Sequence, residues 1–257
     1  MPQLKNIPSV LSHWNHESLE KDDWSPFTYL THPTKYGEEK LKEKHKRVRR
    51  IPMGLDLDRY KFINEYPPKE VRIGYVGRIV PWKRLHLICE VAKELGYTVL
   101  GCGYIDKPNY FSEKVEKYIM DGTLEWHGNM GRKGMKPLEF KNNLYSKMTV
   151  FVMASEGEYE SGPLPAQEAM ALGVPVLSTQ KGTIRDRGED GSNVLLFDEN
   201  NKEQFKTKLK ELVENEPLRM KLRKAAWKTA MSNPEQKMAW AYGKLYYEVI
   251  NKFKGGE

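Results

Sequence analysis

The chain has 257 residues, of which 30% are charged and 39% hydrophobic, and this composition indicates a folded protein long enough to bury a sizeable core. The only cysteines are Cys89 and Cys102, which argues against a disulfide framework or a zinc finger and favours a reducing cytoplasm. The net charge of +7 favours an anionic partner: a phosphate-bearing ligand, a nucleic acid or an anionic lipid surface.

No stretch of the sequence is long and apolar enough to predict a membrane-spanning helix. The longest clean apolar stretch covers residues 150–154, far short of the roughly 20 residues that a bilayer requires. The N-terminus lacks the basic and then apolar order of a signal peptide. We therefore expect a cytoplasmic protein.

The first 66 residues carry few regular patterns. They contain one predicted strand at 27–31 and one polar helix at 35–46, which is too little for an independent α/β domain. Residues 40–50 hold seven Lys or Arg against one Glu. We expect there a solvated helix end that leads into a strand, and the alternative is a specific contact with an anion or a peripheral contact with a membrane surface.

From residue 71 onward the sequence alternates between strand and helix patterns. A buried strand ends at Gly77, and apolar residues then recur at helical spacing until Gly96. Such alternation predicts a parallel sheet covered by helices on both faces, a doubly wound α/β fold. The predicted strands are 71–76, 98–100, 123–126, 149–153, 175–177 and 194–197, and the helices are 85–95, 111–120, 166–172, 203–214, 218–231 and 235–253.

The first candidate site follows the strand at 71–76. Gly77 ends this strand, and Arg78 and Lys83 come soon after it. Doubly wound sheets bind ligands at the carboxyl ends of their strands, where an Arg fork and a Lys charge can hold a diphosphate. The alternative is a pair of exposed surface cations.

The second candidate site follows the strand at 149–153. Glu160 lies on a loop, and Glu168 lies eight residues later, about one turn into a helix. The amides of Gly162, Leu164 and Ala166 are expected to be free at the start of this helix, where they favour an anion. Glu168 can accept hydrogen bonds from vicinal hydroxyls such as those of a ribose; the alternative is an acid that complements the helix dipole.

A third candidate is the turn at 126–131, which includes Gly128, Asn129 and Met130. Its backbone could face a nucleobase. The alternative is a plain turn without a binding role.

Five motifs in their expected order resemble those of the retaining glycosyltransferases of the GT-B fold, of the group 1 or family 4 type. The resemblance covers the chain from about Arg50 to its end. The motifs are IPMGLD at 51–56, YVGR at 75–78 with Lys83, GCG at 101–103, the Glu pair at 160 and 168 with EAMALGVPV at 168–176, and DGSN at 190–193. The last motif departs from the family pattern because Val194 replaces a Gly.

The resemblance implies a UDP- or GDP-linked sugar donor and retention of the anomeric configuration. Arg78 and Lys83 would bind the diphosphate and stabilise it as a leaving group, so that neither a metal nor another cofactor is required. Glu160 would face the donor sugar as the third catalytic residue, and Glu168 would bind the ribose. The donor-binding set is then Gly77, Arg78, Lys83, Gly128, Asn129, Met130, Glu160, Ser161, Gly162, Pro163, Leu164 and Glu168.

The N-terminal region departs from the family most strongly. Members carry a complete N-terminal Rossmann domain for the acceptor, and only the tail of one fits in residues 1–66. We therefore divide the chain into a reduced acceptor-side segment (1–66), a Rossmann-like donor-binding domain (67–234) and a C-terminal crossover helix (235–257). Since that helix lacks a full domain to pack on, we expect exposed apolar surface, and self-association or a partner chain.

The sequence thus predicts a metal-independent hexosyltransferase that acts on an unknown acceptor, with a non-catalytic nucleotide-sugar-binding subunit as the alternative. The family's catalytic-site His has no match, and we expect His13, His16 and His32 to be surface or turn residues. A nucleic-acid-binding protein is disfavoured because residues 40–50 lack interleaved aromatic side chains.

Overall fold

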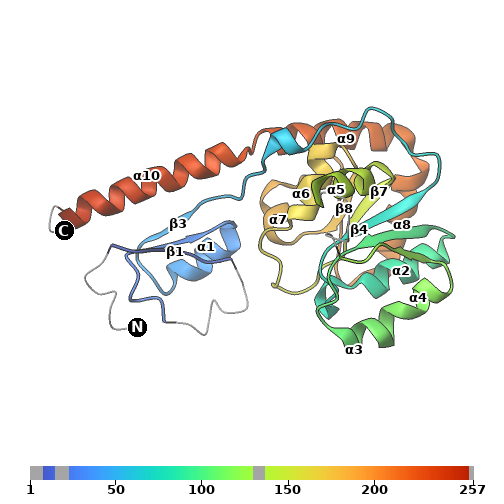
Figure 1. Ribbon diagram of the computed structural model, residues 1–257, viewed down its shortest axis with the longest axis horizontal. Coiled ribbons are helices and arrows are strands. Elements are labelled where there is room, and N and C mark those ends of the chain that lie inside the picture. Colours follow the sequence, from blue (N-terminus) through green and yellow to red (C-terminus); the bar gives the residue numbers. More distant parts are fainter. Residues whose placement is uncertain (1–7, 15–22, 130–136, 255–257) are drawn as a thin grey trace.

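The computed structural model describes residues 8–14, 23–129 and 137–254, which form two parallel sheets (Figure 1). The large sheet has the strand order β6-β5-β4-β7-β8-β9, and every pair in it is parallel. Its strands are β4 (Arg72–Val76), β5 (Thr98–Cys102), β6 (Leu124–Trp126), β7 (Val150–Met153), β8 (Val176–Thr179) and β9 (Leu195–Phe197). The predicted doubly wound sheet is confirmed.

The strand order places a topological switch between β4 and β7. The chain proceeds from β4 outward through β5 to β6, returns to β7 beside β4, and then proceeds the other way to β9. At such a switch the connections leave on opposite sides of the sheet, so the carboxyl ends of the two strands border a crevice. This crevice is where the fold positions a ligand.

The side chains of the large sheet alternate between two cores. On β4, Ile73 and Tyr75 face one core and Val76 the other; on β7, Val152 faces the first core and Phe151 the second. Because both cores take apolar side chains, each of these two strands is a nearly continuous apolar run in the sequence, which is the buried-strand pattern predicted at 71–76 and 149–153. Helices α2, α4 and α8 cover the first face, and α5, α6 and α9 cover the second.

Most predicted helices are present, with ends that shift by a few residues. The predicted helix at 111–120 is instead a broken segment, because it begins at Pro108 and contains a π-helical turn, Phe111–Val115. Helices α5 and α7 were not predicted. The helices are α2 (Leu85–Glu94), α3 (Pro108–Tyr110), α4 (Glu116–Met120), α5 (Pro137–Ser146), α6 (Leu164–Leu172), α7 (Gly182–Arg187), α8 (Lys202–Glu214) and α9 (Glu216–Met231), with short 3-10 helices Leu57–Arg59 and Pro81–Lys83.

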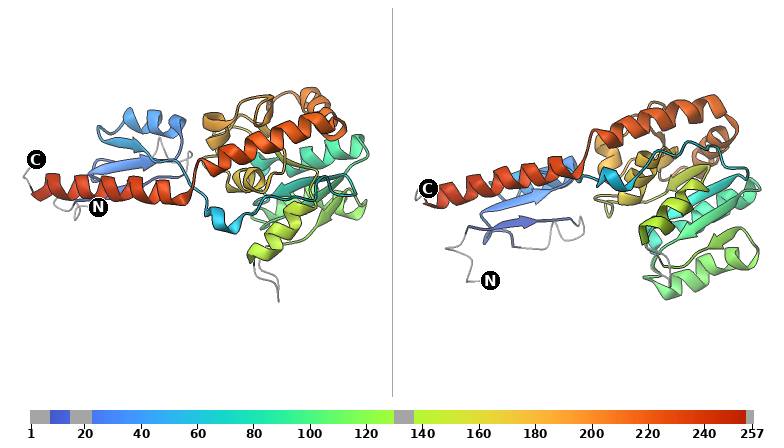
Figure 2. Two further views of the ribbon diagram at one scale, coloured as in Figure 1. Left: turned by 90° about the horizontal axis from the view of Figure 1, so that it is seen from above. Right: turned by 45° about the horizontal axis from the view of Figure 1, so that its top comes forward.

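The N-terminal region builds a small sheet of its own, with the order β1 (Val10–Ser12), β2 (Tyr29–His32) and β3 (Val48–Arg50). The expectation of a single strand was therefore wrong. Leu30 of β2 packs with Leu41 of α1 (Lys35–Lys42) on one face. Its neighbour Tyr29 packs with Leu245 of α10 (Glu235–Lys254) on the other. Helix α10 accordingly lies along the small sheet in both views of Figure 2.

The basic run at 40–50 follows the predicted form, because α1 ends at Lys42 and β3 begins at Val48. Two of its cations pair with acids from elsewhere in the chain. Arg49 lies 2.8 Å from Glu248 of α10, and Arg50 lies 3.2 Å from Asp186 of α7.

Among the described residues, no helix combines the length and the apolarity needed to cross a membrane.

Candidate functional site

A cavity of about 600 Å³ lies at the carboxyl ends of β4, β5 and β7, where the strand order predicts a ligand site. The structure brings nine of the sequence-predicted residues to its wall. They are Gly77, Arg78, Lys83, Asn129, Glu160, Ser161, Gly162, Pro163 and Leu164. The first candidate motif, most of the second and part of the third therefore form one site.

Lys83 and Glu160 form an ion pair at the cavity wall. Lys83 Nζ lies 2.7 Å from Glu160 Oε2, and the side chains are only 13% and 7% exposed. The Ser155 hydroxyl donates to the same carboxylate oxygen at 3.1 Å. Lys83 Nζ also lies 4.6 Å from the ring centre of Trp82, within reach of a cation–π contact. Charge and hydrogen bonds thus hold both groups in place.

Arg78 is held much less firmly than Lys83. Its side chain is 57% exposed, and Nη1 lies 3.0 Å from Asp106 Oδ2. Exposed pairs of this kind contribute little to stability, about 0–1 kcal/mol. The guanidinium can therefore exchange Asp106 for an anionic ligand at small cost.

Close backbone packing at Gly103 shapes the floor between β4 and β5. Gly103 has a φ of +156°, and a Cβ there would lie 1.8 Å from the carbonyl oxygen of Gly77. The Gly103 amide donates to the carbonyl of Gly128 at 2.9 Å. Gly128 thus lies behind the wall and supports it, whereas Asn129 lines the cavity. Met130 lies outside the described residues.

The start of α6 differs from the expectation of free amides. The Leu164 amide donates to the carbonyl of Gly162 at 2.7 Å, and the Ala166 amide donates to that of Pro163 at 3.1 Å. The expectation was wrong for these two amides. Pro163, with φ −69° and ψ 82°, is the central residue of an inverse γ-turn, which directs the Leu164 amide to Gly162, and the Ala166 amide bonds within the first turn of α6. An anion would have to compete with these bonds.

The structure does not bring Glu168 to the cavity. This carboxylate is 2% exposed and accepts hydrogen bonds from Tyr60 at 2.9 Å and Tyr145 at 3.0 Å, while Lys141 forms an ion pair with it. Burial, aided by the charge of Glu168, raises the pKa of Tyr60 above its usual value, so that phenol stays a donor. Binding of a ribose by Glu168 stays a prediction.

Aromatic side chains line the cavity in a way that sequence reasoning missed. Trp82 and Tyr159 lie with ring centres 5.9 Å apart, and Trp14 and Tyr104 are further lining residues. Trp14 comes from the small-sheet region, and its carbonyl accepts a hydrogen bond from Ser161. Trp82 could have been found from its place between the two cations, but Trp14 follows a strand that no local pattern predicts.

His13 and His32 are buried, contrary to the expectation of surface or turn residues. His13 and His32 are only 8% and 1% exposed, and their ring centres are 5.8 Å apart. His32 Nδ1 lies 3.1 Å from the Thr34 amide, at the point where α1 begins. Neither lines the cavity, and His16 lies outside the described residues.

Comparison with known sequences gives one family match. The family model described as "Glycosyl transferases group 1" matches residues 56–229. An uncharacterized glycosyltransferase of Methanocaldococcus jannaschii is 27% identical over 177 residues, which cover 68% of this chain and 47% of that protein. The chain spans about half the length of the curated relatives that it matches first.

Solved structures share the fold. Sucrose-phosphate synthase from Thermosynechococcus elongatus has a TM-score of 0.78 at 16% identity, over 94% of this chain and 68% of that one. The Anabaena protein Alr3699/HepE, solved in complex with UDP, has a TM-score of 0.76 at 14% identity, over 94% and 72%. These likenesses confirm an α/β fold of the GT-B type, with parallel sheets.

Proposed function

The chain belongs to the glycosyl transferases of group 1, and from this premise we propose that it transfers a hexose from a UDP- or GDP-sugar to an acceptor, with retention of configuration and without a metal. The observation that carries the proposal is the pairing of Lys83 with Glu160 in a cavity at the topological switch of the sheet. The Anabaena structure with UDP supports a nucleotide donor, although at 14% identity it establishes the fold alone.

Arg78 and Lys83 would bind the diphosphate of the donor. Both line one cavity, and Lys83 is largely buried, so its charge acts with little screening by water. When the glycosidic bond of the donor breaks, negative charge develops on the phosphate oxygens of the leaving group. Two cations at that point stabilise the transition state more than the ground state, Lys83 because its ion pair holds it there and Arg78 once it exchanges Asp106 for the phosphate.

Glu160 would face the donor sugar. Its Oε2 is taken up by Lys83 and Ser155, and a carboxylate offers about four acceptor positions in all. The remaining positions can accept sugar hydroxyls and orient the ring. The backbone at 161–164 would border the same sugar and the phosphate, since these residues line the cavity beside Glu160.

The nucleoside would extend toward Asn129 and Glu168. Three donors already contact the Glu168 carboxylate, which leaves room for about one more hydrogen bond. A ribose hydroxyl would therefore have to take that position or displace one of the two tyrosines. Because Glu168 is only 2% exposed, side chains around it must shift on either route.

Two surfaces would serve partners. Helix α10 packs on the small sheet by one side, and its opposite side exposes Trp240 and Tyr247, at 65% and 70%. We infer that this exposed side mediates self-association or contact with a partner chain, and that residues 40–50 meet an acidic acceptor or an anionic membrane surface. Light scattering across a range of protein concentrations tests the first, since a clean monomer throughout would contradict it.

The test of the function is donor turnover across a panel of UDP- and GDP-sugars, measured as release of free nucleotide with and without chelator. The proposal predicts slow hydrolysis of at least one hexose donor that persists in chelator and is absent in Glu160→Gln. Saturable binding of a nucleotide without turnover of any donor would instead support the non-catalytic subunit.

A further inference from the structure

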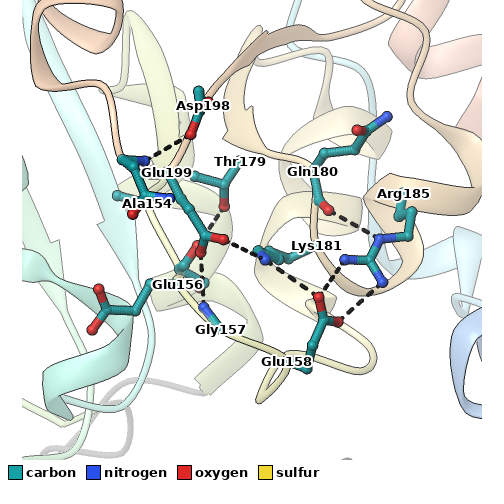
Figure 3. Close-up of polar contacts among 12 residues, drawn as sticks. Ala154, Glu156, Gly157, Glu158, Thr179, Gln180, Lys181, Arg185, Asp198 and Glu199 are labelled. Carbon is teal, nitrogen blue, oxygen red and sulfur yellow. Dashed lines mark hydrogen bonds and ion pairs between the residues drawn. The ribbon is translucent and has the colours of Figure 1, made fainter.

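The loop that carries Glu160 is held by charged side chains from helix α7, from the residue before α7 and from the loop after β9 (Figure 3). It runs from the end of β7 to the start of α6 and has no helix or strand of its own. The Gly157 amide donates to Glu199 Oε2 at 2.8 Å, and Arg185 contacts both carboxylate oxygens of Glu158, at 3.0 and 2.6 Å. Lys181 lies between the two acids, 2.8 Å from Glu199 and 3.4 Å from Glu158.

These contacts are partly shielded from water. Lys181 is only 10% exposed, and Glu199 is 23% exposed. Burial by itself would raise the pKa of Glu158, but the hydrogen bonds and charges of Arg185 and Lys181 outweigh it and lower that pKa. Glu158 is therefore charged at neutral pH, and it holds the loop by charge-assisted hydrogen bonds to Arg185 and Lys181.

Arg84, the residue after Lys83, connects this network to the other side of the cavity. Its Nε donates to the carbonyl of Ala154 at 2.7 Å, and its Nη1 donates to the carbonyl of Glu199 at 2.7 Å. Arg84 also has a φ of +50°, the one positive value among the non-glycine residues that the structure describes. A side chain in this region costs free energy and persists only where surrounding contacts hold it.

Two closed rings of contacts result. In the first ring, Arg84 follows Lys83 in the chain and donates to the Glu199 carbonyl. The Glu199 carboxylate accepts from the Gly157 amide. Glu160 lies three residues after Gly157 and closes the ring through its ion pair with Lys83. In the second, Arg84 binds the carbonyl of Ala154, and the next residue, Ser155, donates to Glu160. Each ring fixes one end of the Lys83–Glu160 pair relative to the other.

We propose that Arg84 and Glu199 are positioning residues that set the geometry of Lys83 and Glu160 for donor turnover. The inference rests on the proposed function. Neither residue lines the cavity, so both act through the groups that they hold. Misplacement of a reacting group by about 1 Å can cost roughly 100-fold in rate, so loss of either tether should lower kcat more than it weakens nucleotide binding.

The test compares Arg84→Lys with Arg223→Lys. Arg223 is a matched control because it too is a buried arginine that donates to two backbone carbonyls, those of Gly173 and Ile63, on α9 and away from the cavity. We expect Arg84→Lys to lower kcat of donor turnover by about 100-fold with less than about a threefold change in UDP affinity. Arg223→Lys should lower the melting temperature comparably and keep kcat within about threefold.

A second pair of variants, at Glu199, tests the other tether. Glu199→Ala removes the acceptor for the Gly157 amide, whereas Glu199→Gln retains an oxygen for it and loses only the charge that faces Lys181. We expect Glu199→Gln to recover most of the kcat that Glu199→Ala loses, and we expect faster amide hydrogen exchange at 155–160 in Glu199→Ala and Arg84→Lys but not in Glu199→Gln. Equal kcat in wild type, Arg84→Lys and Glu199→Ala would overturn the inference.

The exchange experiment separates this inference from the proposed function. A wild-type protein that neither binds UDP nor turns over any donor would contradict the function. Exchange at 155–160 would still report whether Glu199 and Arg84 hold the loop, and unchanged exchange in both variants would contradict the tethering.

Discussion

Lys83 Nζ lies 2.7 Å from Glu160 Oε2, so the cation proposed to bind the diphosphate is paired with the carboxylate proposed to face the sugar. A donor that enters the cavity must share Lys83 between its phosphate and Glu160. This arrangement suits a donor whose phosphate and sugar lie side by side. Lys83 would then act on nucleotide binding and Glu160 on donor turnover, so substitutions can separate the two effects.

Substitution of Glu160 should separate turnover from binding. Glu160→Gln removes the charge that competes for Lys83, so UDP affinity should stay within about threefold of wild type or rise, while donor turnover falls by at least about 100-fold. Calorimetry and nucleotide release measure the two effects. Asp121→Asn, in the exposed Lys93–Asp121 pair, is the control and should change neither; wild-type turnover in Glu160→Gln would refute its catalytic role.

Gly103 should be intolerant of any side chain. An Ala Cβ at this position would meet the Gly77 carbonyl at 1.8 Å, so Gly103→Ala should destabilise the fold by more than about 3 kcal/mol or prevent folding. Urea denaturation followed by circular dichroism measures the loss.

Gly96→Ala is the matched control for Gly103. Gly96 also has a positive φ, +72°, but a Cβ at this position would meet no other atom within 4 Å, so the cost should be about 1–2 kcal/mol. If both variants lost the same free energy of unfolding, backbone conformation alone, and not close packing of the loops after β4 and β5, would explain why Gly103 tolerates no side chain.

Helix α10 should stabilise the small sheet through its buried side. Leu245 is fully buried against Tyr29 and Ile51, so Leu245→Ala should cost about 2–5 kcal/mol. Ile250→Ala on the same helix is the control, because Ile250 is 45% exposed and should cost about 0.5 kcal/mol or less. Amide exchange of β2 should accelerate in Leu245→Ala and not in the control; protection unchanged in both would contradict this packing.

Stability should fall at high pH because of the half-buried Tyr66. Burial raises the pKa of Tyr66 from 10.0 to about 12, and its hydroxyl donates to the Thr149 carbonyl at 2.7 Å. The folded state favours the neutral phenol of Tyr66, which adds to the free energy of unfolding. This stabilisation is fully present below pH 10 and is lost as the pH rises toward 12. The free energy of unfolding should therefore decline over that window, and less steeply in Tyr66→Phe; identical slopes would contradict the shift.

Local patterns predicted the large sheet well. β7 is a β-branched run whose residues alternate between two cores, and Arg78 and Lys83 follow a strand that ends in Gly, so both the fold and the cations could be found from sequence. The small sheet could not be predicted from local patterns. β1 and β3 have three residues each and lie in stretches without a run of β-branched residues, and they form because distant segments pair with β2.

The partners of site residues were equally beyond local patterns. Glu168 is buried by Tyr60 and Tyr145, which come from segments 108 and 23 residues away. The amide of Leu164 is turned inward by the backbone angles of Pro163, a choice of turn that the sequence leaves open. Arg84 is likewise identified only by its backbone conformation and its two carbonyl acceptors.

The most direct test of the central claim is calorimetric titration of UDP and GDP into wild type, Arg78→Ala, Lys83→Ala and Lys93→Ala. A charge-assisted bond to phosphate contributes about 1.5–3 kcal/mol, so each of the first two variants should lose about 10- to 150-fold in affinity for the preferred nucleotide. Lys93, exposed and paired with Asp121, is the control and should match wild type. Saturable binding with unchanged affinity in Arg78→Ala and Lys83→Ala, or no binding of either nucleotide to wild type, would contradict a diphosphate site in this cavity.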